Sequence, residues 1–310
     1  MKAAHVRRSS RFPLHLTVLG LAGLLVAPLF AQAPEQPAAP QPSAEQAAQP
    51  AAPSLTDEQI EKFLTTARVT RTKGISKGVT NSVRVTLSDG TLTHDAHVQV
   101  IDERKTSGPS AGGTEMNFRD SWVFNIAAYK LDRLIGMNLV PVSVERRHKT
   151  QPAAFTWWVD DVQMDEGERL KRKATSPLPA QWNEQMQMVR VFDQLIYNMD
   201  RNLGNLLITK DWQVWAIDHT RAFRLHKELK APENITRCDR QMYERLKQLD
   251  KATLTRAMGN HLASWEIDAI LARRDAIIAR LDQGGPGALF DRRDGRGVNN
   301  AVAASASAVR

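Results

Sequence analysis

The chain has 310 residues, a formal net charge of +8 and one cysteine, Cys238. A single cysteine excludes an intrachain disulfide framework, and we expect Cys238 to be packed rather than reactive. The basic balance would suit phosphates, acidic lipids or nucleic acid, although a solubilising surface explains it more simply. Because the sequence has no basic helix with interleaved aromatic side chains, we expect no nucleic-acid partner.

The first 33 residues have the parts of an export signal. A basic start, MKAAHVRRSSR, precedes the apolar run LHLTVLGLAGLLVAPLF, and AQA follows as a small-residue cleavage site. Pro34 would follow the cut and disfavours hydrolysis, so the segment alternatively remains as an anchor at the lower limit of about 17 residues for a spanning helix. We expect an exported protein, periplasmic or extracellular, held at the inner membrane if the segment is not cleaved.

Two low-complexity segments border the region that is expected to fold. Residues 34–54 are rich in Pro, Ala and Gln and predict a disordered linker. Residues 284–310 are rich in Gly and Ala and predict a disordered tail. The remaining residues, 55–283, suit one two-lobed domain that buries its own core without covalent cross-links.

The first half of this domain, about residues 66–165, is predicted to be a small sheet that carries one helix. TDEQIEKFLTTA has a capping-box pattern and begins with a short helix. The alternating runs SVRVTLSDG and HDAHVQVIDE, joined at Asp89-Gly90, predict a β-hairpin. After an expected loop at SGPSAGG, the pattern of FRDSWVFNIAAYKLDRLIG predicts a helix that ends at Gly136. LVPVSVERR and AAFTWWVDDVQMDE predict further strands.

The second half, about residues 178–283, is predicted to be mainly helical. QWNEQMQMVRVFDQLIYNM has the period of a long amphipathic helix. Two strands follow, NLLIT and WQVWAID, joined by a tight turn at Lys210 and Asp211. CDRQMYERLKQL, KATLTRAMGNHL and SWEIDAILARRDAIIARL predict three helices. A β-rich lobe followed by an α-rich lobe is an α+β fold.

Asp200, Asn205 and Asp218 are expected to meet at one end of this strand pair. Asp200 follows the long helix, and a tight hairpin would place Asn205, at the start of one strand, beside Asp218, at the end of the other. An amide oxygen and a carboxylate make an oxygen-only site suited to Mg²⁺, and Asp200 lies near enough to accept a proton from a nucleophile. Each residue alone could cap a helix end or a turn. The three in this order match the parts of a phosphoryl-transfer site.

The motifs NMDRNLGNLLI and WAIDHTRAF resemble the catalytic and metal-binding loops of the phosphatidylinositol-kinase-like branch of the protein-kinase superfamily. This branch includes HipA-type kinases and the secretory-pathway kinases of the Golgi. IAAYKLDRLIGMNLVP resembles the helix that follows the nucleotide-binding strands there, and the resemblance covers about residues 72–223. It implies a two-lobed kinase-like fold with ATP and Mg²⁺ or Mn²⁺ as cofactors.

The resemblance also implies roles for individual residues. Asp200 matches the catalytic base, and Asn205 and Asp218 match the metal ligands. Gly74 and Gly78 fall where a phosphate-covering loop would be, although a short glycine-containing segment is weak support by itself.

Two positions depart from the family's pattern. Gln99 stands where the family has a phosphate-binding Lys, and Asn125 stands where it has the partner Glu. The double change leaves two neutral amides that can hydrogen-bond, rather than one unpaired buried charge. We expect Gln99 and Asn125 in the nucleotide site, with weaker phosphate binding than a Lys would give. Candidates to replace the lost cation and carboxylate are Lys73, Lys77, Lys105, Glu115 and Asp120.

Four other side chains border the expected site. Arg201 and Arg221 flank the metal-binding loop and either neutralise phosphate or bind local carboxylates. Trp157 and Trp158 lie near the expected connection between the lobes, where one would face the adenine site and the other the core.

Two functions follow from these patterns. The first is an ATP- and metal-dependent phosphotransferase that acts on a protein, a lipid or a small hydroxyl compound. The alternative is a pseudokinase that serves as a nucleotide-binding or scaffold module, favoured by Gln99, by Asn125 and by the scarcity of ATP outside the cytoplasm. The expected partners are a nucleotide and a hydroxyl-bearing substrate, with membrane contact only through an uncleaved N-terminal segment.

Overall fold

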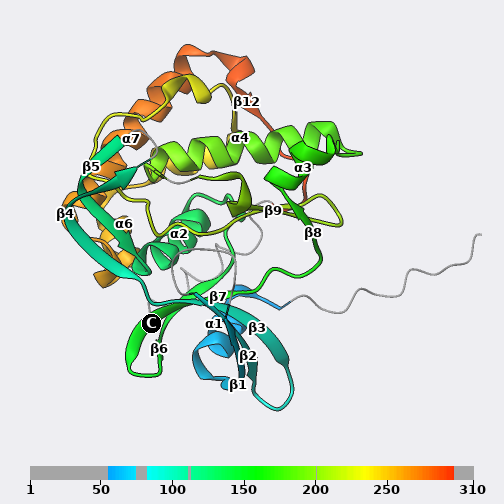
Figure 1. Cartoon of the computed structure of the whole chain (residues 1–310). Helices are drawn as coiled ribbons and strands as arrows, with labels where there is room; N and C mark the ends of the chain where they lie inside the picture. The colour runs from blue at the N-terminus through cyan, green and yellow to red at the C-terminus, as the bar shows by residue number, and fades with distance from the viewer. Residues whose placement is uncertain (1–54, 75–81, 111–112, 200, 297–310) are drawn as a thin grey trace, which may run out of the picture. The chain divides into compact units, whose positions relative to one another are not determined.

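The residues described by the computed structural model are 55–74, 82–110, 113–199 and 201–296 (Figure 1). The expected export signal and linker lie outside the described residues, as do Lys77, Gly78 and Asp200. The α+β prediction of a β-rich lobe followed by a mainly helical lobe is confirmed.

The N-terminal lobe is built on a five-stranded antiparallel sheet with the order β1-β2-β3-β7-β6. Its strands are β1 (Arg68–Gly74), β2 (Val83–Ser88), β3 (Thr93–Gln99), β6 (Ser143–His148) and β7 (Gln151–Trp157). β2 and β3 form the hairpin predicted at Asp89-Gly90. Helix α1 (Asp57–Thr66) begins with the predicted capping box and packs on β6 and β7. Because strand side chains alternate, Val85 and Val98 enter the core while their neighbours point to the opposite face.

A second hairpin precedes the helix of this lobe and corrects the predicted start of that helix. The elements are β4 (Asp102–Ser110), β5 (Gly113–Ser121) and α2 (Val123–Leu134). The sequence predicted helix from Phe118, but Phe118 pairs with Lys105 and the ladder continues to Ser121. Cross-strand hydrogen bonds outweigh the local helical period here, because propensity is a weak prior against tertiary pairing. Gly136, with a φ of 69°, follows the helix as predicted.

The same hairpin divides a strand that was predicted to be continuous. The run from 94 to 103 leaves the first sheet after Gln99 and enters β4 at Asp102. At the break, the carbonyl of Ile101 accepts a hydrogen bond from the backbone of Trp122 at 2.8 Å. The predicted loop SGPSAGG was also too long, since residues 107–110 belong to β4.

The C-terminal lobe holds a small sheet and the long helices. The sheet has the order β10-β9-β8 and contains β8 (Val162–Asp165), β9 (Leu206–Thr209) and β10 (Val214–Ala216). The helices are α3 (Glu166–Arg172), α4 (Pro179–Leu195), α5 (Arg240–Gln248), α6 (Lys251–Met258) and α7 (Ser264–Gln283). Short 3₁₀ turns are η1 (Leu203–Asn205), η2 (Pro232–Asn234), η3 (Gly259–His261) and η4 (Pro286–Ala288). The long helix, the hairpin and the three following helices agree with the sequence prediction.

Cys238 is buried, as predicted. It begins β11 (Cys238–Asp239), which pairs in parallel with β12 (Leu289–Phe290) after α7. Burial raises the pKa of the Cys238 thiol, which keeps the side chain protonated and unreactive.

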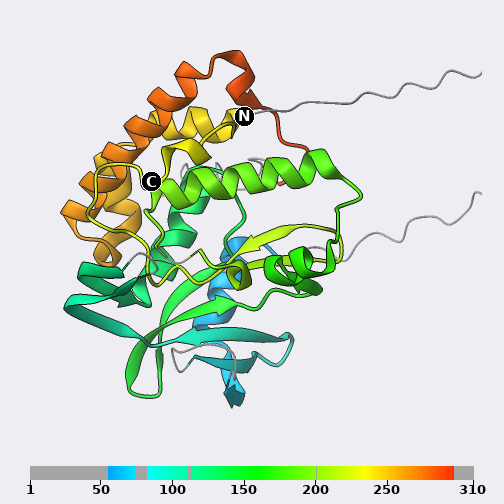
Figure 2. The ribbon, with the colours of Figure 1, turned by 45° about the horizontal axis from the view of Figure 1, so that its top comes forward.

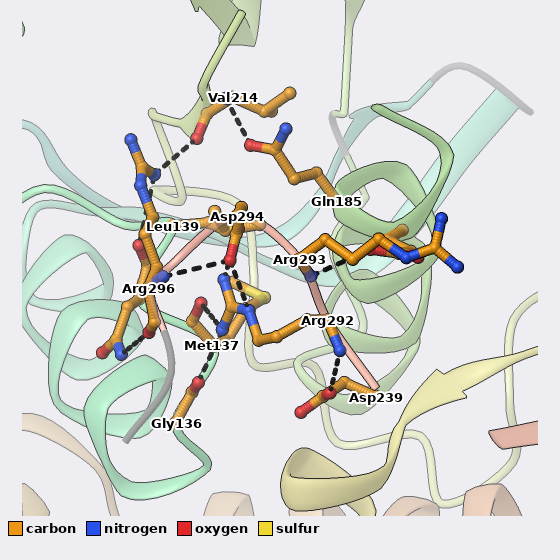
Figure 3. A network of polar contacts seen from close by, with 12 residues as sticks. Gly136, Met137, Leu139, Gln185, Val214, Asp239, Arg292, Arg293, Asp294 and Arg296 are labelled. Atoms are coloured by element: carbon orange, nitrogen blue, oxygen red, sulfur yellow. Dashed lines mark hydrogen bonds and ion pairs between the residues drawn. The ribbon is translucent and has the colours of Figure 1, made fainter. Parts of the chain in front are cut away.

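Residues 284–296 include η4 and β12, which corrects the disordered tail predicted over this range, and residues 297–310 lie outside the described residues. Leu289 and Phe290 form β12, and the segment then crosses the molecule toward α2 and β10 (Figure 3). We call residues 289–296 the C-terminal strap. The composition was misleading because arginine donors that bind backbone carbonyls, rather than apolar bulk, fix most of this segment.

Figures 1 and 2 show how the elements are layered. The sheet of β1, β2, β3, β6 and β7 lies at one end with α1, the helices α4 and α7 lie at the other, and α2 lies between them. In both views the β4–β5 hairpin extends toward α7, where Arg119 of β5 pairs with Glu266. No helix within the described ranges combines the length and apolarity needed to cross a membrane.

Candidate active site

The β9–β10 hairpin places the backbone of Asn205 opposite Ile217, the residue that precedes Asp218. Ala216 pairs with Leu206, and one residue further the backbone N–H of Ile217 donates to the Asn205 carbonyl at 3.0 Å. Asn205 ends η1, and Asp218 follows β10 with a φ of 54°. Such a left-handed conformation is strained for a residue other than glycine and is frequent at functional sites. The two residues predicted to share a metal are therefore close along the backbone, with Asp218 one residue beyond the position opposite Asn205.

Arg201 holds the start of this hairpin against helix α4. Its guanidinium donates to the carbonyls of Asn205 at 3.2 Å and Ile217 at 2.9 Å. It also pairs with the Asp193 carboxylate at 2.9 Å. Of the two roles left open by the sequence, the structure shows the carboxylate-binding one. The sequence reasoning missed Asp193, whose signal is a carboxylate near the C-terminal end of α4, where the helix dipole disfavours negative charge.

His219 links Arg201 to the N-terminal lobe. Nε2 of His219 accepts a hydrogen bond from Nη2 of Arg201 at 2.9 Å, and its backbone N–H donates to Oδ1 of Asn125 at 2.8 Å. Burial and the neighbouring Arg201 cation both lower the pKa of His219 well below its usual 6.5. The ring is therefore neutral at neutral pH and acts as a positioning residue.

Gln99 and Asn125 form the predicted amide pair, and the pair reaches Asp218. Nδ2 of Asn125 donates to Oε1 of Gln99, and Nε2 of Gln99 donates to Oδ1 of Asp218 at 3.2 Å. Gln99 and Asn125 are 2% and 4% exposed, so each amide group depends on these partners. This chain of hydrogen bonds uses neutral groups alone to orient the Asp218 carboxylate.

Glu115 lies on β5 and binds arginines of the segment after Asp218. Arg221 pairs with Glu115 at 3.1 Å, and the buried Arg224 pairs with the same carboxylate. Arg221 therefore serves a local carboxylate here, and Glu115 is already neutralised. Neither observation makes Glu115 a replacement for the carboxylate lost at Asn125.

Asp120 is better placed than Glu115 to serve the site. It is the penultimate residue of β5, and the N–H of Ser121, which ends the strand, donates to the Thr220 carbonyl at 2.9 Å. The Thr220 side chain hydrogen-bonds Asp120 and also donates to Oδ1 of Asp218 at 3.1 Å. Burial raises the pKa of Asp120, the Thr220 hydrogen bond lowers it, and the Asp218 carboxylate raises it further.

The face of the first sheet opposite to the core carries charged side chains. Strand register aligns Lys73 with Arg84, and Arg84 with His97, so these three share the face that also carries Gln99. Arg84 pairs with Asp95 and lies 4.0 Å from the Trp158 ring centroid. A cavity of about 390 Å³ on this face is lined by Arg71, Lys73, Gly74, Arg84, Thr86, Asp95 and Trp158.

Of the candidate cations and the two tryptophans, only some line this cavity. Lys73 lines it, whereas Lys105 pairs with Glu103 on the β4–β5 hairpin. Trp158 lines the same cavity, while Trp157 packs edge-on against Phe63 of α1 at 5.8 Å. One tryptophan therefore faces the expected nucleotide region and the other packs on the lobe's core.

A larger hollow of about 1070 Å³ lies beside the expected catalytic loop. Its lining includes Met199, which directly precedes Asp200 in the sequence, and residues of β4, β5 and α7. Met116, Leu225 and Trp265 contribute exposed apolar surface, with 64%, 48% and 63% of their areas accessible. The basic lining residues are Arg104, Lys105, Arg119, Arg224, His226 and Lys227.

The donor set around Asp218 suits a divalent metal that keeps other ligands. Within the described part of the chain, no three His, Cys, Asp or Glu side chains gather into a closed metal cage. Mg²⁺ is instead bound by one or two carboxylates together with water and substrate phosphates. Asn205, Asp218 and the nearby Asp120 supply oxygen donors only, which fits Mg²⁺ or Mn²⁺ and excludes a thiolate-type zinc site.

Comparisons with known proteins identify the fold. No protein-family model matches the sequence, and no curated protein matches it either. Solved structures do match. Hydra Fam20, determined with sugar, aligns with a TM-score of 0.55 at 16% identity and covers 76% of this chain and 92% of that chain.

A second group of matches is the Golgi casein kinase. Its crystal structure aligns with a TM-score of 0.53 at 14% identity and covers 77% of this chain and 79% of that chain. The crystal structure with Mn/ADP bound aligns with a TM-score of 0.54 at 14% identity, covering 77% and 80%. The resemblance to secretory-pathway kinases is therefore confirmed as a kinase-like fold.

Proposed function

We propose that this chain is an exported phosphotransferase that uses ATP and Mg²⁺ or Mn²⁺ to phosphorylate a hydroxyl-bearing substrate. The observation that carries the proposal is the adjacency of Asn205 and Asp218 on a kinase-like fold. One structural neighbour holds Mn/ADP, which supports this cofactor pair for the fold. Export is inferred from the N-terminal sequence alone.

Each part of the site has a proposed role. Asn205 and Asp218 hold the metal, which when bound would neutralise charge on the transferred phosphoryl group. Asp200 accepts the proton of the attacking hydroxyl, and Gln99 with Asn125 orients the Asp218 carboxylate.

Two cavities would accommodate the reactants. Arg71 and Lys73 of β1 supply positive charge along the smaller cavity, where the family's β3 Lys is missing. The larger cavity is lined in part by Met199, the residue before Asp200 in the sequence, and is the proposed acceptor site. Protein, lipid and small-molecule acceptors all fit a hollow of this size.

The alternative function is a pseudokinase, and the nucleotide half of the site supports it. In protein kinases the residue two before the β3 Lys is a small alanine, whereas this chain has His97. His97 is paired with Arg84, whose side chain lies over Trp158 and pairs with Asp95. These bulky polar groups occupy the face on which an adenine ring would rest. In this reading the chain would act as a scaffold or weak nucleotide sensor.

Thermal unfolding of the full chain with ATP and Mn²⁺ separates these functions. Ligand at a hundredfold excess over its Kd should raise the Tm by roughly 5–10 °C. The shift should be lost in Asp218→Asn and retained in Asp275→Asn, a matched change at a carboxylate that is 66% exposed. Absence of a shift with any nucleotide would exclude both readings.

Transfer of radiolabelled phosphate from ATP then tests catalysis. A phosphotransferase should label itself or an added protein, lipid or sugar acceptor, and Asp200→Ala should abolish the label while keeping the Tm shift. A shift without label, unchanged by Asp200→Ala, would establish the pseudokinase.

A further inference from the structure

The Thr220 hydroxyl lies between two carboxylates that come from different lobes. Its Oγ1 donates to Oδ1 of Asp218 at 3.1 Å, and the same side chain hydrogen-bonds Asp120. Two hydrogen bonds to one oxygen limit the separation of the two carboxylates to about 6 Å. A hydroxyl has one proton, so it can donate to only one of the two at a time.

Asp120 is left incompletely satisfied by this arrangement. The residue is 8% exposed, and its Oδ1 is buried without a hydrogen-bond partner among the residues that the structure describes. Buried carboxylate oxygens are almost always paired, since desolvation is unfavourable when nothing replaces the lost water. An orphaned oxygen of this kind points to a ligand that the site is built to receive.

The charged groups near Asp120 do not compensate its negative charge. Asp218 and Glu103 repel its negative charge, and Arg221 is the cation that opposes them. Arg221 is shared with Glu115, and Glu115 also binds Arg224. A further positive charge between Asp120 and Asp218 would relieve the repulsion between them.

The backbone fixes Asp120 in this place. The Ser121 N–H donates to the Thr220 carbonyl at 2.9 Å, which ties the end of β5 to the segment after Asp218. Asn125, where the family has a carboxylate, lies in the first turn of α2 and is hydrogen-bonded to Gln99 and His219. The carboxylate missing at Asn125 is thus matched by one at Asp120.

We propose that Asp120 is a direct ligand of the divalent cation held by Asp218, so that the cation bridges the two lobes. The proposal rests on the metal-binding part of the proposed function and adds to it a ligand from β5. Asp120, Asp218 and Asn205 would provide a hard oxygen site that binds Mn²⁺ or Mg²⁺ before any nucleotide arrives.

Mn²⁺ binding to the full chain without nucleotide tests the proposal, with free Mn²⁺ measured by electron paramagnetic resonance. We expect Asp120→Asn to weaken Mn²⁺ binding by about tenfold or more, as loss of a carboxylate near a metal does. Asp218→Asn should weaken it at least as much. Glu103→Gln is the matched control, because Glu103 pairs with Asp120 across the hairpin but is exposed, and it should leave binding within about twofold of wild type.

A second measurement guards against misfolding. In buffer with a chelator, Asp120→Asn should raise the Tm because it removes one of two crowded carboxylates, while in Mn²⁺ the variant should gain less Tm than wild type. Wild-type Mn²⁺ affinity in Asp120→Asn, together with weakened binding in Asp218→Asn, would overturn the assignment of Asp120 and leave the proposed function intact. Undetectable Mn²⁺ binding in the wild-type chain, with or without ATP, would instead overturn both.

Discussion

Gln99 and Asn125 form a buried pair of neutral amides at the two positions where the sequence resemblance led us to expect a Lys and a Glu. Both side chains are buried, and each has a partner at both ends of its amide group. A buried ion pair is strongly disrupted when one member is lost, whereas a neutral pair needs only hydrogen bonds. The sequence alone indicated that the two positions had changed together, and the contact between them gives the reason.

This pairing predicts energetic coupling between Gln99 and Asn125. Asn125→Glu places a buried carboxylate near Asp218 and should lower the unfolding free energy by about 2 kcal/mol or more. Gln99→Lys in the same protein should recover about 1 kcal/mol or more by restoring an ion pair. Urea unfolding of the wild type, both single variants and the double variant measures the coupling. Additivity of the two changes within about 0.5 kcal/mol would contradict it.

His219 predicts a loss of stability in mild acid. Its folded-state pKa is lowered below 6.5, so as the pH falls the unfolded chain takes up a proton that the folded chain refuses. The neutral His219 therefore costs no stability above about pH 6.5. Below that pH the free energy of unfolding falls, by up to about 1.4 kcal/mol at one pH unit lower.

Comparison of urea unfolding at pH 7.5 and 5.5 isolates this contribution. His219→Gln keeps an acceptor for Arg201 but does not titrate, so it should lose less stability than wild type over this interval. Because other histidines also titrate, the difference between the two proteins is the relevant quantity. Equal losses in the two proteins would show that His219 is not the group responsible.

At the scale of elements, local signals predicted the hairpins and helices that carry Asn205 and Asp218. The turn at Lys210-Asp211 and the alternation around it suffice to predict the strand pair, in which Asn205 lies opposite Ile217, the residue before Asp218. The β4–β5 hairpin was only half predicted, because Phe118 and the residues after it continue the apolar pattern of α2 without a break. The hydrogen bonds between β4 and β5, rather than the local apolar pattern, decide that residues 118–121 form a strand. The position of Asp120 beside Thr220 depends on that pairing and was therefore beyond the sequence.

The contact between β5 and the segment after Asp218 predicts that the substitution Glu115→Gln strongly destabilises the fold. Glu115 and Arg224 are 8% and 5% exposed, so Glu115→Gln leaves a buried guanidinium without its counter-charge. We expect the unfolding free energy to fall by about 3 kcal/mol. Glu103→Gln, on the neighbouring strand, removes an exposed pair with Lys105 and should change it by less than about 1 kcal/mol. Similar urea midpoints for the two variants would contradict a structural role for the buried pair.

At the scale of the molecule, the C-terminal strap joins parts of the chain that are distant in sequence. Arg292 donates to the carbonyls of Gly136 at 3.0 Å and Met137 at 2.9 Å, just after α2 (Figure 3). Arg296 donates to the carbonyl of Val214 at 3.1 Å, in the hairpin that leads to Asp218. Burial lowers the pKa of Arg296 to about 10, which leaves the guanidinium charged at neutral pH. The strap thus connects the end of α2 to the β9–β10 hairpin.

Shortening the chain at two points tests the strap as a unit. Ending the chain after Asp291 removes Arg292, Asp294 and Arg296 and leaves buried carbonyls of the α2–β6 connection and β10 without donors. Each lost partner destabilises by about 1–3 kcal/mol, so the total should be about 3 kcal/mol or more.

Ending the chain after Arg296 is the matched control, because it keeps the hydrogen bonds of Arg292 and Arg296 given above and removes only residues 297–310. In urea unfolding, the chain that ends after Arg296 should have the wild-type midpoint, and the chain that ends after Asp291 should have a midpoint well below it. Arg292→Met, which keeps the length of the side chain and removes its donors, should account for part of the loss. Equal midpoints for the two truncated chains would show that the strap lies on the surface without stabilising the join between α2 and the Asp218 hairpin.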